Sequence, residues 1–136
     1  MYKSILVPVA FDHVGFGENA IVVARKLLNH DGQLTLLHVM DDVPGYITSY
    51  LPEGILEANR KDALAKLNDL AKKAGQNCSV AVIKGHANRS IIAHAAEKGM
   101  DCIVIASHKP GLEDYFLGST AAHVVRHAKC SVHVIR

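Results

Sequence analysis

Five short apolar runs are spaced along the chain, and segments with helical spacing lie between them. A continuous run of apolar residues is typical of a strand that is covered on both faces of its sheet. Between the runs, apolar residues recur at i, i+3, i+4 and i+7, as they do in residues 20–28, and this spacing predicts one apolar helix face. Gly32, Gly75 and Gly99 are predicted to end the first three helices. The runs predicted to be strands are residues 5–9, 34–39, 80–83, 101–106 and 131–135.

The alternation of strands and helices predicts an α/β fold with a parallel sheet. Right-handed crossovers favour a single doubly wound domain over residues 1–136, with five parallel strands in the order 3-2-1-4-5 and two helices on each face. Pro8 is predicted to end the first strand, because proline cannot donate to a ladder. In this order strands two and three are added on one side of strand one, and strands four and five are added on its other side. A ligand is therefore expected beyond the carboxyl ends of strands one and four, where residues 8–12 and 107–119 surround one crevice.

The stretch from residue 101 to residue 136 holds the strongest candidate for a site. A long loop follows the strand at residues 101–106 and ends at Gly118, Ser119 and Thr120, where a helix is predicted to begin. Ser119 is expected to cap this helix with its hydroxyl, and Gly118 is expected to let a ligand approach the backbone. The first amides of a helix have no partner within it and attract anions, so a phosphate group is expected here. A plain helix start is the alternative reading.

Composition and charge narrow the classes of function. The chain has 136 residues, 49% of them hydrophobic and 21% charged, which is ordinary for a soluble globular protein. Its formal net charge of +2 is too small to indicate binding to nucleic acid or to an anionic membrane. There is neither an apolar run of the ~20 residues that a membrane span needs nor a signal peptide, so a cytoplasmic protein is expected. The cysteines are expected to be small buried hydrophobes rather than a redox pair.

The histidines and the missing catalytic motifs bear on chemistry. His123 and His127 lie four residues apart, a spacing that can hold a metal, but no carboxylate or cysteine accompanies them, so no metal site is expected. His38 and His133 lie in apolar strands and are expected to be hydrogen-bonded structural residues. The sequence contains neither a nucleophile elbow nor a phosphate-binding loop of the Gly-x-x-x-x-Gly-Lys type, so enzyme activity is not expected.

Several motifs, taken in order, resemble those of the universal stress protein family. They are the Ile-Leu-Val-Pro-Val run at residues 5–9, the His-Val pair at residues 38–39, the Gly-Ser pair at residues 118–119 and the Val-Val-Arg-His-Ala run at residues 124–128. The similarity covers essentially the whole chain. It implies the doubly wound fold, a homodimer and, in some members, a bound ATP. The Ser-His-Lys-Pro sequence at residues 107–110, in place of the usual Gly-x-x-Gly, resembles a subgroup of the family that keeps Gly-Ser.

The resemblance also implies a set of nucleotide contacts. This chain has Ala10 where the family has an aspartate, with Asp12 two residues later, and its loop is one residue shorter. Backbone amides bind phosphate whatever the side chain, so ATP, with or without magnesium, is the expected ligand. Asp12 is expected at the ribose or at a metal on the phosphates, or else as a turn aspartate. Lys109 is expected to neutralise phosphate, or else to be a solvated loop lysine. The implied contacts are Pro8, Val9, Ala10, Asp12, Val39, Ala106, Ser107, His108, Lys109, Gly118, Ser119 and Thr120.

The expected function is therefore that of an ATP-type nucleotide-binding regulator of the stress response. It is expected to pair with itself through strand Ser131–Ile135 and to act on a regulatory protein that the sequence does not identify, with no nucleic-acid or membrane partner. One alternative is a nucleotide-free interaction module that acts through residues 41–53. Another is an enzyme that hydrolyses ATP slowly or transfers phosphate, with His108 and Asp12 as the nearby candidates for a base.

Overall fold

One five-stranded parallel sheet forms the centre of the molecule. The computed structural model describes residues 1–11, 16–107 and 117–136. Its strand order is β3-β2-β1-β4-β5, as the sequence predicted, and every neighbouring pair is parallel. The strands are β1 (Tyr2–Pro8), β2 (Leu28–Met40), β3 (Cys78–Lys84), β4 (Cys102–Ala106) and β5 (Ser131–Ile135).

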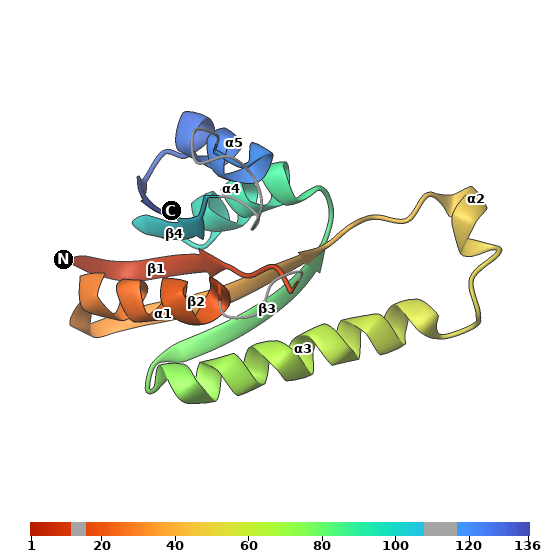
Figure 1. Cartoon of the computed structure of the whole chain (residues 1–136), viewed down its shortest axis with the longest axis horizontal. Coiled ribbons are helices and arrows are strands. Elements are labelled where there is room, and N and C mark those ends of the chain that lie inside the picture. Colours follow the sequence, from red (N-terminus) through yellow and green to blue (C-terminus); the bar gives the residue numbers. More distant parts are fainter. Residues whose placement is uncertain (12–15, 108–116) are drawn as a thin grey trace.

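In the part of the chain that the structure describes, four helices cover the two faces of this sheet, two on each face (Figure 1). On one face, buried side chains of α1 and α3 join the core, and on the other face those of α4 and α5 do so. The prediction of two helices on each face is therefore confirmed, and a fifth, short helix, α2, lies apart from both layers. None of the helices in the described residues is long and apolar enough to cross a membrane. The helices are α1 (Phe16–Leu27), α2 (Gly45–Thr48), α3 (Ile55–Ala74), α4 (Ala87–Glu97) and α5 (Ser119–His127).

The continuous apolar runs exist because both faces of each central strand are covered. Successive side chains of a strand point to opposite faces. Ile5 and Val7 of β1 accordingly belong to the core under α1 and α3, while Leu6 belongs to the core under α4 and α5, and all three are fully buried. β1 ends at Pro8, as predicted.

The prediction that Gly32 ends the first helix is wrong. α1 already ends at Leu27, and β2 begins at Leu28 and contains Gly32. The pairing of β1 with β2 shifts register in this region, because Tyr2 lies opposite Leu28 but Ser4 lies opposite Gln33. A Cβ on Gly32 would lie 2.6 Å from the Leu28 side chain and 3.0 Å from the Lys3 carbonyl oxygen. Glycine is needed here for close packing at a strand irregularity, not for a helix end.

The other two predicted helix ends are confirmed. Gly75 follows α3 with φ of 95°, and Gly99 lies two residues after α4 with φ of 66°, both in the region that glycine enters at little cost. Arg25 of α1 adds a long-range cap, since its Nε donates to the Ala74 carbonyl oxygen at 2.6 Å. The end of α3 is therefore fixed to α1 as well as to the sheet.

Candidate functional site

The candidate site lies where the strand order reverses, at the carboxyl ends of β1 and β4. The two strands are paired through Ile5 with Cys102 and Leu6 with Ile103. From here β2 and its crossover leave in one direction and β5 leaves in the other. The connections on the two sides of this point run away from each other and leave a crevice, which is the usual place for a ligand in an open α/β sheet.

Hydrogen bonds to its neighbours fix the backbone just after β1. The amide of Val9 donates to the Leu37 carbonyl oxygen at 2.7 Å, which continues the pairing with β2 past Pro8. The Val9 carbonyl oxygen lies 2.8 Å from His38 Nδ1, which must carry the proton because a carbonyl oxygen only accepts. The His38 ring also contacts Phe11, with ring centroids 4.6 Å apart. The predicted structural, hydrogen-bonded role of His38 is confirmed.

The predicted nucleotide contacts at the ends of β1 and β2 do not all face the same way. Val9 is buried in the core under α1 and α3, whereas Val39 packs at the edge of the core under α4 and α5. Ala10 is exposed beyond the end of β1, and Pro8 is half-buried. The side chains of Val9 and Val39 therefore pack on opposite faces of the sheet.

The ends of the loop that follows β4 are held together. The amide of Ser107 donates to the Ile135 carbonyl oxygen at 2.8 Å, and the Ser107 carbonyl oxygen accepts a hydrogen bond from the amide of Gly118. Ser107 is almost fully buried, and Ala106, the last residue of β4, is half-buried. These bonds bring the amino end of α5 to the carboxyl end of β4, where the sequence predicted one side of the crevice.

The prediction that Ser119 caps α5 is wrong. Gly118 occupies the cap position, with φ of −58° and ψ of 155°, and Ser119 is already the first residue inside the helix. From inside the helix a hydroxyl cannot reach the amides that a cap satisfies. Within the described part of the chain, no side chain caps this helix. The first hydrogen bond of the helix runs from the amide of Ala122 to the Gly118 carbonyl oxygen at 2.9 Å, so the amides of Ser119, Thr120 and Ala121 have no acceptor within the helix.

Asp12, His108 and Lys109 lie outside the described residues, so their predicted roles at the ribose or the phosphates stay predictions. Thr120, the remaining predicted contact, is half-buried in the first turn of α5. The described residues thus bring together the ends of β1 and β4 and the first turn of α5.

Sequence reasoning missed a hollow beside the crevice. A cavity of about 230 Å³ lies next to Ala10 and Phe11, between the end of β1 and helices α1 and α3. Lys66 of α3 reaches over the Phe11 ring, with its Nζ 5.4 Å from the ring centroid. Nothing in the sequence near Phe11 predicts this contact, because Lys66 lies more than fifty residues away in the chain.

The described titratable groups include His123 and Cys102, whose pKa values are shifted. They include no group of three or more histidine, cysteine or acidic side chains that could hold a metal ion. The rings of His123 and His127 contact each other with centroids 4.4 Å apart. Partial desolvation, followed by the positive charges of His127 and its neighbours, lowers the pKa of His123. Burial is the main cause that raises the pKa of the Cys102 thiol to about 11, so this cysteine is an inert hydrophobe.

Comparison with known proteins decides the family. The family model described as the universal stress protein family matches residues 1–136, the whole chain. The chain belongs to the universal stress protein family. Universal stress protein G of Salmonella typhimurium is 31% identical over 147 residues, with all of both chains covered.

Solved structures of family members share the fold. Universal stress protein UspA from Lactobacillus plantarum is 28% identical, with a TM-score of 0.73 over 99% of this chain and 98% of its own. A family member from Arabidopsis thaliana, solved with AMP bound, has a TM-score of 0.68 at 18% identity, over 98% of this chain and 90% of its own. Another, solved in complex with cAMP, has a TM-score of 0.67 at 21% identity, over 99% of this chain and 97% of its own.

Proposed function

We propose that this universal stress protein is a regulator that binds an ATP-type adenine nucleotide at the crevice between the ends of β1 and β4. The observation that carries the proposal is the amino end of α5, which lacks a side-chain cap among the described residues and is joined through Gly118 to Ser107 at the end of β4. Amides that point outward at such an end favour an anion, and the end lies at the reversal of strand order.

Two further observations support an adenine nucleotide as the anion. The backbone after β1 is fixed at Val9 by Leu37 and His38, so it offers a rigid edge to a base. Relatives of the same fold were solved with AMP and with cAMP. The proposed contacts are made mainly by backbone atoms, so the exposed Ala10, in place of the family's aspartate, is compatible with binding.

The chemistry of the crevice supports a regulatory role. Hydrolysis needs a group to orient or deprotonate water, and the sequence offers Asp12 and His108 as candidates for that group. Helix amides bind the ground state and the transition state about equally, which lowers a dissociation constant without accelerating a reaction. We therefore infer at most slow hydrolysis, and a bound nucleotide that serves as a signal to a protein partner.

We also propose that the protein is a homodimer that pairs through β5. This strand lies at one edge of the sheet, with Val132, Val134 and Ile135 half-buried. An apolar edge strand is a risk for aggregation unless another element covers it, and a twofold partner strand would cover both edges at once.

Calorimetry with ATP and magnesium tests nucleotide binding. The φ and ψ of Gly118 are accessible to any residue, so Gly118→Val should fold normally while its side chain blocks the approach of phosphate. We expect the variant to bind at least about tenfold more weakly than wild type, which is roughly 1.4 kcal/mol. Val125→Ser, which replaces an exposed side chain on the same helix, is the matched control and should bind as wild type does. Absence of ATP binding to the wild type would overturn the proposal.

A further inference from the structure

Residues 41–54, here called the arm, expose large side chains that the proposed function does not use. Tyr46 is 73% exposed, Ile47 is 38% exposed and Tyr50 is 86% exposed. The arm contains the short helix α2, which buries no residue, and it stands away from the sheet and its four covering helices (Figure 1). Clustered exposed apolar side chains mark a surface that another molecule covers.

The arm is held in shape by its own local hydrogen bonds. Thr48 Oγ1 donates to the Gly45 carbonyl oxygen at 2.7 Å, and Ser49 Oγ donates to the Tyr46 carbonyl oxygen at 2.9 Å. The backbone of the same turn is closed by the amide of Ile47, which donates to the Pro44 carbonyl oxygen at 2.9 Å. The arm therefore presents its tyrosines from a shaped turn, which lowers the entropy lost when they are buried.

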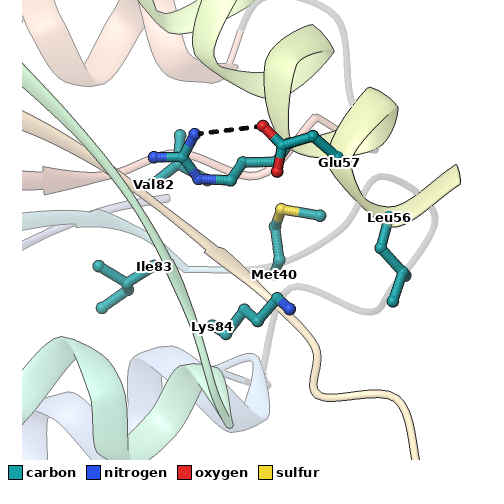
Figure 2. A pocket seen from close by; sticks show the side chains of 7 residues that line it. Met40, Leu56, Glu57, Val82, Ile83 and Lys84 are labelled. Atoms are coloured by element: carbon teal, nitrogen blue, oxygen red, sulfur yellow. Dashed lines mark ion pairs between the residues drawn. The ribbon is translucent and has the colours of Figure 1, made fainter. Parts of the chain in front are cut away.

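A cavity of about 420 Å³ lies at the root of the arm, between α3 and the end of β3 (Figure 2). This volume falls within the roughly 300–1,000 Å³ of pockets that hold small molecules. Figure 2 shows Met40 at its centre, between Leu56 and Glu57 of α3 on one side and Lys84 of β3 on the other. The remaining lining residues are Arg60, Val82 and Ile83, so among the described residues no member of the arm occupies the cavity.

The charges of the arm and of the cavity are complementary. The arm carries Asp41, Asp42 and Glu53 and no basic residue. The cavity carries Arg60 and Lys84, and its one acidic residue, Glu57, lies 4.0 Å from Arg60 in an exposed ion pair. Opposite charges of this kind steer association and fix its register.

We propose that the arm docks on a second copy of this chain, with Tyr46 and Tyr50 of each copy set into the cavity of the other. The arm leaves the body directly after Met40 and returns directly before Ile55, so its two ends lie beside the cavity. A twofold axis near these ends places each arm over the other cavity, and one pairing then satisfies both surfaces. The four tyrosines, each able to bury roughly 150–250 Å², supply about half of the roughly 1,200–2,000 Å² that a specific interface needs.

This arm interface is separate from the nucleotide crevice and from the β5 edge. The cavity shares no lining residue with the described contacts predicted for the nucleotide. β3 and β5 lie at opposite edges of the sheet, so one copy can use both edges at once. With both in use, the arm interface joins β5-paired dimers to one another.

Sedimentation equilibrium of the whole chain tests the arm interface. The double variant Tyr46→Ser/Tyr50→Ser removes exposed side chains only, so it should fold as wild type does. We expect it to lose one arm-dependent association step that wild type shows, with that step weakened at least tenfold. Val22→Ser, which removes a 57% exposed apolar side chain of α1, is the control and should leave the step intact. Identical association of wild type and the double variant would overturn the proposal.

A mixing experiment identifies the occupant of the cavity. In one variant, Arg60→Glu/Lys84→Glu makes the cavity acidic; in the other, Asp41→Lys/Asp42→Lys/Glu53→Lys makes the arm basic. Each variant alone should repel itself at the arm interface, whereas the mixture pairs acidic arm with basic cavity and basic arm with acidic cavity. We expect the association step to return only in the mixture. If the arm instead serves a different protein, the mixture will stay as dissociated as its components, and the proposal fails.

Discussion

The crevice and the arm both lie at the carboxyl ends of the strands, but they are built in opposite ways. At the crevice, long-range backbone bonds fix the chain, as between Val9 and Leu37 and between Ser107 and Ile135. In the arm the hydrogen bonds are local, and Tyr50 faces solvent. A site made from backbone atoms tolerates side-chain changes such as Ala10, whereas a surface made from side chains changes with each substitution.

The largest expected effect is on the stability of the sheet and the helices that cover it, whose strand ends form the crevice. Ile103 of β4 is fully buried in the core under α4 and α5. Ile103→Ala should lower the free energy of unfolding by about 2–5 kcal/mol, since it removes buried methyl groups and leaves a cavity. Urea denaturation followed by circular dichroism measures this loss.

Tyr50→Ala in the arm is the matched comparison. Because Tyr50 is 86% exposed, its removal should change the free energy of unfolding by no more than about 0.5 kcal/mol in a sample dilute enough to prevent association. A large loss in that sample would show that the arm packs on its own chain, and the contrast between the two regions would be wrong.

Particular residues show how far sequence alone could predict this molecule. Pro8, Gly75 and Gly99 each act locally, through a missing donor or a positive φ, and the ends they predicted are confirmed. Gly32 misled because its role depends on Lys3, a residue of another strand. The local signal of a glycine is the same whether it ends a helix or packs against a neighbour.

The candidate site divides in the same way. Its place at the reversal of strand order follows from the alternation of elements, and the joining of residues 107 and 118 follows from that topology. The opposite orientations of Val9 and Val39 and the cavity beside Met40 depend on which face each strand turns to which helix. Parts of β2, α3 and β3 line this cavity, and no short sequence motif indicates that three such separate segments lie together.

A smaller effect is expected at the joint between β1 and β4, at the opposite end of these strands from the crevice. The Asp101 carboxylate accepts hydrogen bonds from the amides of Lys3 at 2.9 Å and Ser4 at 3.0 Å. Asp101→Ala leaves both amides without this acceptor and should lower the free energy of unfolding by about 1–3 kcal/mol. Thermal unfolding of variant and wild type in the same buffer measures the change.

Asp62→Ala is the control for that variant. It removes an exposed carboxylate that pairs with Lys66 at 3.1 Å on the surface of α3, and such pairs contribute only about 0.3–0.5 kcal/mol. An equal loss of unfolding free energy in the two variants would mean that Asp101 contributes only as an exposed charge. Its hydrogen bonds would then not hold β1 to β4.

The smallest expected effect is a pH dependence of stability that arises in the sheet and its covering helices and not in the arm. His94 of α4 is buried, and this burial, reinforced by Lys98 and opposed by Glu97, lowers the pKa of its imidazole. The unfolded chain then binds more protons than the folded chain once the pH falls below the ordinary histidine pKa of about 6.5. The free energy of unfolding should therefore decrease as the pH falls from about 7 toward the lowered pKa of His94, and it should be unaffected by this group above that window. His94→Gln should flatten this slope in urea denaturation at a series of pH values, while Tyr50→Ala should keep the wild-type slope. A His94→Gln slope as steep as that of wild type would assign the pH dependence to other groups.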